Sequence, residues 1–144
     1  MASSTPDDAT AFNRTVIEEF RANEGHVSGF SARAPVILIH HIGARSGIER
    51  ITPLGCFPLG DDRYVIVASS GGSPTHPDWY HNLKAHPRID VEVGTRAFTV
   101  LAEELDGRAR AELWPKLVAD APDLGKHATK TTRRFPVFLL TRQD

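Results

Sequence analysis

The sequence predicts a mostly β protein of the α+β class, an antiparallel sheet or barrel with helices packed on it, and three observations support this. About six segments have the length and the β-branched composition of strands. Helical segments stand near the front, the middle and the back of the chain, so the strand–helix alternation of a parallel sheet is absent. The length of 144 residues fits one domain, residues 1–144, because no repeat or linker divides the chain.

The first predicted helix begins near Asp8. Its apolar residues have the spacing of one helix face, and they are Phe12, Val16, Ile17 and Phe20. Asp7 or Asp8 provides an N-cap, and Gly25 provides a stop. Residues 1–8 are small and polar, and we expect them to be disordered.

Two predicted strands lie on either side of a turn at residues 43–48. Residues 35–42 hardly alternate between polar and apolar, which is typical of a buried strand. Residues 49–60 alternate better, but Pro53 and Pro58 restrict this stretch to an edge, a bend or a bulge. The next strand begins at Tyr64 and runs into a loop rich in glycine and serine.

The second half of the chain predicts two helices, a hairpin and a closing strand. A short helix follows Pro77, which suits a first helical turn. Residues 87–105 predict a hairpin with its turn at Gly94. The next helix is interrupted or starts anew near Pro115, and residues 135–142 form the last strand.

The composition argues against several classes of function. The formal charge is −1, so no overall field attracts nucleic acid. Cys56 is the single cysteine, which rules out an internal disulfide and fits a reducing compartment. No apolar run reaches the roughly 20 residues that span a bilayer, and the N-terminus lacks the pattern of a signal peptide. We therefore expect a cytoplasmic protein without a nucleic-acid partner.

The turn after the first strand concentrates positive charge and backbone freedom. Gly43 and Gly47 let the backbone turn sharply and bring N–H groups close to a ligand. Arg45 and Arg50 add forked donors that suit phosphate or carboxylate, and Ser46 adds a hydroxyl. Together they predict a backbone nest with cationic walls that holds an anion. A hairpin turn with solvated arginines explains the turn by itself equally well.

A second loop of small residues favours the anion-binding interpretation. Residues 69–72, Ser-Ser-Gly-Gly, end a strand and lead into the helix after Pro77, whose N-terminus favours negative charge. Two such loops at strand ends suit one extended, anionic cofactor. Trp79 and Tyr80 offer flat apolar surface beside it, although a helix that carries such residues more often packs on the sheet.

The sequence resembles the deazaflavin-dependent nitroreductase family in four motifs that follow one another between about Pro35 and Arg142: GARSGIERITPL, VIVASSGG, PDWYHNLKAHPRIDVEVG and FPVFLLTR. The resemblance implies a split β-barrel and an actinobacterial oxidoreductase that uses coenzyme F-420. It implies hydride transfer from the reduced deazaflavin to a small planar acceptor, which is a quinone, an enone or a nitroaromatic compound.

The resemblance also implies roles for individual residues. The first turn would hold the phosphate and the acidic tail of the coenzyme, and Ser69 matches a serine near the deazaflavin ring. The implied cofactor-binding residues are Gly43, Arg45, Ser46, Gly47, Arg50, Pro53, Leu54, Ser69, Ser70, Gly71, Gly72, Trp79, Tyr80 and Asn82.

The chain departs from the family pattern in two places. Ala44 and Ser70 stand where relatives often carry arginine and lysine, so two cationic contacts are lost. Ala121, Leu124 and His127 stand where the best-known member carries tyrosines along its substrate pocket. We therefore expect a different acceptor pocket, and reduction of nitroimidazoles is in doubt.

Hydride transfer requires little acid–base chemistry from the protein. The candidate catalytic residues are Ser69, which can hydrogen-bond the acceptor or the ring, and His127, whose imidazole exchanges protons near neutral pH. A serine that caps its neighbours and a solvated histidine are the alternatives. No metal site is predicted, because the adjacent His40 and His41 face opposite sides of a strand. Cys56 has no assigned base and is expected to pack in the core.

Two rival functions remain open. An FMN-binding split-barrel oxidoreductase needs only one phosphate, and Ala44 and Ser70 keep that hypothesis open. A non-catalytic protein that stores or delivers coenzyme F-420 fits the altered segment before the last strand. Acidic side chains on the first helix disfavour membrane association without excluding it, and the sequence is consistent with a monomer or a homodimer.

Overall fold

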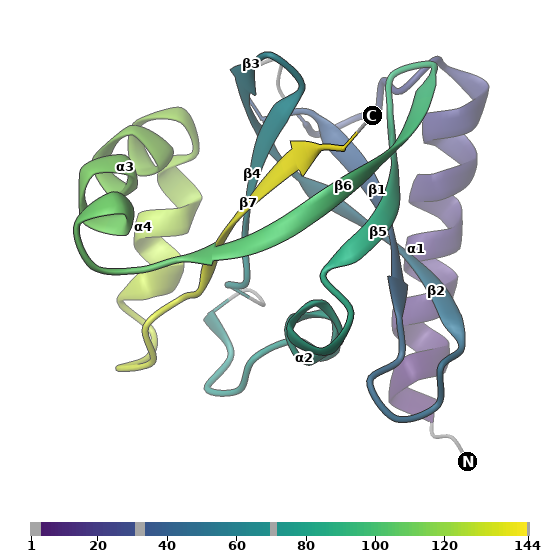
Figure 1. Cartoon of the computed structure of the whole chain (residues 1–144). Helices are drawn as coiled ribbons and strands as arrows, with labels where there is room; N and C mark the ends of the chain where they lie inside the picture. Colours follow the sequence, from purple (N-terminus) through teal and green to yellow (C-terminus); the bar gives the residue numbers. More distant parts are fainter. Residues whose placement is uncertain (1–3, 31–33, 70–71, 144) are drawn as a thin grey trace.

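The computed structural model describes residues 4–30, 34–69 and 72–143 of the chain (Figure 1). The elements are α1 (Ser4–Ala22), β1 (Val36–Ile42), β2 (Glu49–Gly55), β3 (Phe57–Gly60), β4 (Arg63–Val67), α2 (Asp78–Ala85), β5 (Arg88–Val93), β6 (Arg96–Leu105), α3 (Gly107–Asp120), α4 (Pro122–Ala128) and β7 (Val137–Arg142). The predicted α+β class is confirmed. The stretch expected to hold a bend or bulge divides into two strands, β2 and β3.

The strands form one antiparallel sheet in the order β2-β1-β5-β6-β7-β4-β3. β2 and β3 stand at opposite edges of this order, yet only Cys56 separates them in the chain. The sheet therefore curls into a half-barrel whose edges approach each other, as the predicted split barrel requires (Figure 1). Pro53 and Pro58 both lie on edge strands, and the register shifts between Pro58 and Gly60, so the expected edge positions are confirmed.

β1 is buried on both faces, which explains its nearly continuous apolar sequence. Ile37 and Ile39 belong to the core that the sheet shares with α2. Val36 and Leu38 point the other way and pack beneath α1 in a cluster with Phe20. A third cluster joins β3, β4 and β7 to α3 and α4. The helices thus cover the sheet on separate faces and leave α2 at one end of it.

The first helix begins earlier than the sequence predicts. α1 starts at Ser4, so the predicted caps Asp7 and Asp8 lie inside it. Its predicted end is confirmed, because Gly25 follows with φ of +96° and its N–H donates to the carbonyl oxygen of Phe20.

The predicted break near Pro115 is wrong. α3 runs from Gly107 to Asp120 without interruption, and Pro115 lies inside it. A proline removes the helical hydrogen bond to the carbonyl oxygen of Ala111. Both residues are exposed, so that carbonyl oxygen can bond water and the helix continues.

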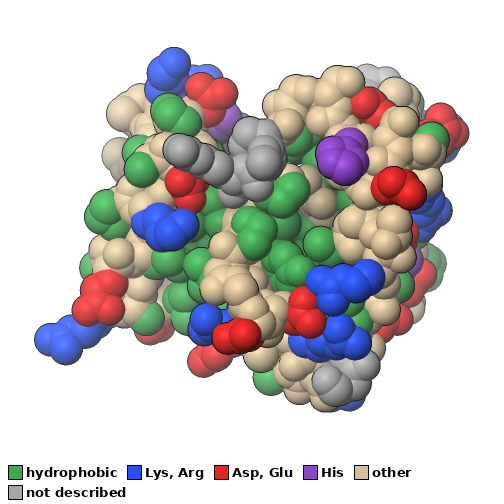
Figure 2. All heavy atoms as spheres, turned by 90° about the horizontal axis from the view of Figure 1, so that it is seen from above, with side chains coloured by type: hydrophobic (Ala, Val, Ile, Leu, Met, Phe, Trp, Pro, Cys, Tyr) green, Lys and Arg blue, Asp and Glu red, His purple; other side chains and the backbone are tan. Residues whose placement is uncertain are grey.

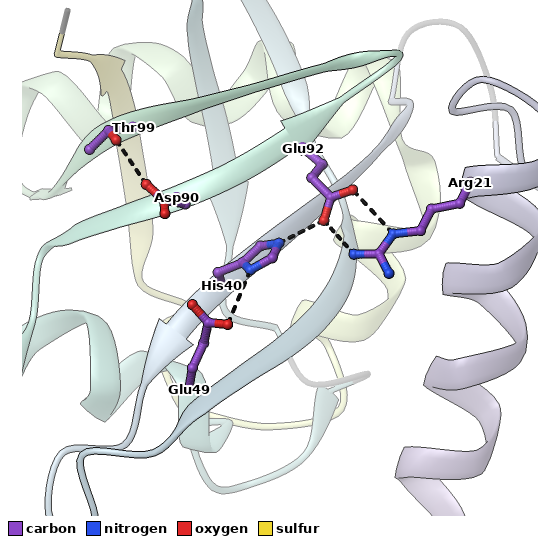
Figure 3. Close-up of polar contacts among 6 residues, drawn as sticks. All are labelled: Arg21, His40, Glu49, Asp90, Glu92 and Thr99. Atoms are coloured by element: carbon purple, nitrogen blue, oxygen red, sulfur yellow. Dashed lines mark hydrogen bonds and ion pairs between the residues drawn. The ribbon is translucent and has the colours of Figure 1, made fainter.

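A polar cluster fastens α1 to the outer face of the sheet (Figure 3). Arg21 donates from Nε and Nη2 to the two carboxylate oxygens of Glu92, at 3.2 and 2.6 Å. His40 lies between two carboxylates, with Nε2 2.6 Å from Glu92 Oε2 and Nδ1 3.5 Å from Glu49 Oε1. Across residues 4–30, 34–69 and 72–143, no group of such side chains has an arrangement that could hold a metal ion. The cluster joins α1, β1, β2 and β5.

The two ends of the half-barrel differ. Figure 2 looks onto the end that is uppermost in Figure 1 and shows hydrophobic side chains in a central hollow with charged side chains around it. A groove of about 990 Å³ lies between the C-terminal end of α1 and the β5–β6 turn, with Glu19, Val36 and Gly94 among its walls. The β1–β2 turn and α2 lie at the opposite end in Figure 1, so this groove is separate from the predicted site.

Candidate functional site

The β1–β2 turn, residues 43–48, is held by its own hydrogen bonds. Gly43 N–H donates to the carbonyl oxygen of Ile48, and Gly47 N–H donates to that of Gly43, both at 2.9 Å. Gly47 has φ of +71°, which favours glycine. A Cβ on Gly43 would collide with Ser46 Oγ. Both glycines of the motif are therefore needed for the shape of the turn.

Most backbone donors of this turn are used inside the protein, which corrects the predicted nest. In addition to the bonds that close the turn, Ile48 N–H donates to Ser46 Oγ at 3.1 Å. Ala44 N–H donates to Oδ1 of the buried Asn82 at 2.9 Å. Anion binding by the turn therefore depends on its side chains more than on its backbone.

Arg45 on the turn and Arg50 at the start of β2 provide the cationic side chains, and both are exposed. In the part of the chain that the structure describes, neither guanidinium forms a hydrogen bond or an ion pair. Arg50 stands opposite His41 in the β1–β2 register, and cross-strand neighbours share a face, so its side chain starts on the inner face of the sheet. Two such guanidinium groups beside a shaped turn fit phosphate and carboxylate groups.

Arg133, just before β7, organises the described part of the second loop. Its guanidinium donates at 2.8–3.0 Å to three carbonyl oxygens, those of Ala68, Ser69 and Ser73. Its Nη1 also lies 2.6 Å from His76 Nδ1, which accepts the bond. Burial, then the charge of Arg133 and then His81, hold the pKa of His76 below its usual value. A neutral His76 is the state that can accept from a guanidinium.

The end of α4 packs against the second loop. Gly72 has φ of +88°, and a Cβ there would lie 2.9 Å from the carbonyl oxygen of His127. This close approach brings the backbone of His127 next to the loop that follows Ser69. Ser70 and Gly71, the other predicted residues of this loop, lie outside the described residues.

α2 and the short segment before it form contacts that reach both loops (Figure 1). Its Asn82 holds the first turn through Ala44, and His76, which precedes the helix, bonds the arginine that holds the second loop. The Tyr80 ring lies 4.4 Å from the His76 ring, and the Tyr80 hydroxyl donates to Glu104 at 3.4 Å. One short helix therefore sets the positions of both loops.

Several predicted site residues have structural roles. Trp79 is buried, with its ring centre 6.0 Å from that of Phe138, so the expectation that it packs on the sheet is confirmed. Asn82 is also buried and uses both ends of its amide within the protein. Leu54 is half-buried against the same core, and Pro53 is half-buried beside it on β2.

Sequence reasoning missed two residues of this site. Arg133 lies in the segment where only the substrate pocket was considered, and His41 was considered only as a metal ligand. The opposite orientation of His40 and His41 is confirmed, because His40 joins the outer cluster and His41 is buried on the inner face. A histidine inside an otherwise apolar strand was the available signal that a buried polar contact exists there.

Comparison with known proteins identifies the family. Residues 12–142 match the model of a family described as F420H(2)-dependent quinone reductase. An F420H(2)-dependent quinone reductase of Mycobacterium tuberculosis strain H37Rv is 38% identical over 112 residues, which cover 76% of this chain and 74% of that protein. A solved structure of an F420-H2 dependent reductase (FDR-A) has a TM-score of 0.64 and 38% identity, covering 74% of this chain and 93% of that chain. Another solved structure, described as a domain-swapped dimer, has a TM-score of 0.66 and 34% identity, covering 91% of this chain and 98% of that chain.

The chain belongs to the F420H(2)-dependent quinone reductase family. It is an oxidoreductase that takes hydride from reduced coenzyme F-420 and reduces quinones. The resemblance to deazaflavin-dependent enzymes is thereby confirmed, and the family names the deazaflavin rather than FMN as the cofactor. In the described ranges, each helix is too short or too polar to cross a bilayer.

Proposed function

We propose that the first turn binds the phosphate and acidic tail of coenzyme F-420 and that the second loop, with Ser69, faces the deazaflavin ring. One observation carries this proposal: the exposed guanidinium groups belong to Arg45, on a turn that Asn82 of α2 holds through Ala44, and to Arg50, at the start of the adjoining strand β2. No described carboxylate pairs with either group, so both are free to bind a polyanion. Because hydrogen bonds already hold the backbone of the turn, the ordering cost of binding phosphate or carboxylate is confined to the two arginine side chains.

Reduced coenzyme F-420 supplies a hydride from its C5 carbon when it is bound. The residues of this chain hold the reactants together and exclude water. Arg45 and Arg50 bind the tail, and Ser69 donates a hydrogen bond to the ring or to the acceptor. The bond from Arg133 fixes the backbone of Ser69 for this task. His127 is the candidate proton donor, and it lies near the end of α4, whose backbone approaches Gly72.

Quinone is the acceptor class of the family, and we propose that small enones and nitroaromatic compounds are further acceptors. The segment before β7 supports an acceptor pocket that differs in shape from the tyrosine-lined pocket of the best-known family member. Leu124 is buried in the core with Leu117, so it cannot take the place of a pocket tyrosine. The half-buried Ala121 and His127 remain as its candidate lining residues.

We propose that the enzyme works in the cytoplasm without nucleic acid. The formal charge of −1 supports this, and the acidic face of α1 disfavours contact with anionic lipid. A relative at 34% identity is described as a domain-swapped dimer, which supports a homodimer as an alternative to a monomer. Sedimentation at several protein concentrations distinguishes the two.

Mixing the purified protein with reduced coenzyme F-420 and a small benzoquinone tests the function. Oxidised coenzyme should appear at about 420 nm, with a rate that saturates in both reactants. FMN in place of the deazaflavin should give no turnover. Saturable coenzyme binding without turnover across quinones and enones would make the protein a carrier, and absence of binding at physiological salt would refute the site.

A further inference from the structure

His41 is buried and has no task in the function proposed above. Its side chain lies on the inner face of β1 and is 3% exposed. Nδ1 lies 2.9 Å from Nδ2 of Asn82, and Nε2 lies 2.8 Å from Oγ1 of Thr52. Asn82 in turn accepts the hydrogen bond from Ala44 N–H at 2.9 Å. A continuous chain of hydrogen bonds therefore runs from Thr52 on β2, through β1 and α2, to the first turn.

The direction of each bond in this chain is fixed. Ala44 N–H can only donate, so the Asn82 atom that faces it is the oxygen. The amide nitrogen of Asn82 then donates to His41 Nδ1, which must carry a lone pair. The proton of a neutral His41 therefore sits on Nε2 and is donated to Thr52. One backbone N–H thus determines the orientation of the amide and the tautomer of the imidazole.

The surroundings keep His41 neutral. Burial is the main cause that lowers the pKa of His41 to about 4, and Arg50 on β2 and His40 on β1 act in the same direction. Asp78 on α2 acts in the opposite direction and is outweighed. A charged imidazole would carry protons on both nitrogens, and its Nδ1 proton would face the amide donor of Asn82. The relay is therefore compatible only with the neutral ring.

We propose that His41 is a positioning residue for coenzyme binding: through Asn82 it holds Ala44, and with it Arg45, in the conformation that receives the anionic tail. This rests on the proposed function of the turn. His41 does not contact the coenzyme and acts only through Asn82. Its effect should therefore appear in the affinity for the coenzyme and in KM, while kcat at saturation changes little.

The variant Asn82→Asp tests the direction of the relay. A carboxylate keeps an acceptor for Ala44 N–H but turns an oxygen toward His41 Nδ1. The bond is restored when Nδ1 of His41 carries a proton, either in the other neutral tautomer, which accepts from the Thr52 hydroxyl, or in the charged ring. The added carboxylate favours the charged ring, so the titration of His41 should move upward, which NMR of the imidazole carbon-bound protons measures. Coenzyme binding by Asn82→Asp should strengthen as the pH falls from about 8 to 6, by roughly tenfold. Wild-type affinity should change far less over this range, because its His41 stays neutral.

A pair of variants at Thr52 tests the relay independently of Asn82→Asp. Thr52→Val keeps the shape of the side chain but removes the acceptor for His41 Nε2–H, whereas Thr52→Ser keeps a hydroxyl. Thr52→Val should weaken coenzyme binding about fivefold with kcat nearly unchanged, and Thr52→Ser should restore it. Thermal unfolding of both variants shows whether a loss of folded protein accounts for the difference.

The outcomes separate this inference from the proposed function. A titration of His41 that does not move upward in Asn82→Asp overturns the direction of the relay, and equal binding by Thr52→Val and Thr52→Ser overturns the positioning role. If the wild type still binds the coenzyme in that case, the proposed function remains intact. Failure of the wild type itself to bind the coenzyme would instead remove the proposed function and this inference with it. If Asn82→Asp does not fold, the Thr52 pair decides alone.

Discussion

The guanidinium of Arg133 donates to the carbonyl oxygen of Ser69 at 2.8 Å, across 64 positions of sequence. The same group bonds the carbonyl oxygens of Ala68 and Ser73 and the ring of His76, and it is stacked over Phe135. The candidate catalytic serine thus stands on a backbone that a single side chain holds. That side chain comes from the segment just before β7, which also departs from the family pattern.

Replacing Arg133 with lysine should loosen the second loop. An ammonium group cannot satisfy three carbonyl oxygens and an imidazole in the geometry of the guanidinium fork. We expect a loss of about 2 kcal/mol in the free energy of unfolding and faster amide exchange around Ser69 and His76. The neighbouring Arg134→Lys, at an exposed position, is the control and should change neither. Equal exchange rates in the two variants would contradict this role of Arg133.

Arg50→Ala should weaken coenzyme binding. The loss of charge-assisted hydrogen bonds to the anionic tail corresponds to about 1.5–3 kcal/mol of binding free energy. Isothermal titration at several salt concentrations should show a smaller salt dependence for the variant, because one cation no longer takes part. Arg108→Ala, at an exposed position on α3, is the matched control. Unchanged affinity of Arg50→Ala would leave Arg50 as a solvated side chain without a role.

Glu92→Gln should weaken the attachment of α1 to the sheet in a pH-dependent way (Figure 3). The bond from Arg21, and then that from His40, lowers the pKa of Glu92 below 4.5. A carboxylate whose pKa is lower in the folded state than in the unfolded state stabilises the folded protein at a pH above its unfolded-state pKa. This stabilisation is lost as the pH falls through the folded-state pKa. The free energy of unfolding of the wild type should exceed that of Glu92→Gln by about 1 kcal/mol near pH 7. Urea unfolding should show this difference shrinking below about pH 4.5.

The control for that experiment is Glu18→Gln, which changes an exposed carboxylate on the same helix. Its stability should follow that of the wild type at every pH. A constant difference between wild type and Glu92→Gln from pH 7 down to pH 3 would show that the lost interaction is steric rather than ionic.

Cys56 should be inert in the native protein. The residue joins the two edge strands and is fully buried, and burial raises the pKa of its thiol to about 12. Iodoacetamide at pH 8 should label it only after unfolding in urea, as mass spectrometry can measure. Rapid labelling of the folded protein would show that the junction of β2 and β3 opens in solution.

The patterns of single elements could be predicted from the sequence. The nearly continuous apolar run of β1 indicated a buried strand, and Pro53 and Pro58 indicated edges, because both signals are local consequences of backbone geometry. The glycine–arginine turn was predicted for the same reason. Pro115 was misleading, since an exposed helix face tolerates a missing hydrogen bond, and exposure is a property of the fold.

The contacts that hold the site could not be predicted in this way. Asn82 was assigned to the cofactor by resemblance, but its partners Ala44 and His41 lie 38 and 41 positions away and meet it only when α2 packs on β1. Arg133 likewise meets Ser69 through the long return of the chain to β7. Such pairings depend on the curvature of the sheet, to which no local sequence signal corresponds.

A crystal structure with bound coenzyme F-420 tests the central claim most directly. The phosphate or a tail carboxylate should lie about 3 Å from the guanidinium of Arg45 or Arg50, with the deazaflavin ring next to Ser69 and the bond from Ala44 N–H to Asn82 intact. A coenzyme bound in the groove beside Gly94, or one whose tail leaves the β1–β2 turn in open solvent, would contradict the claim.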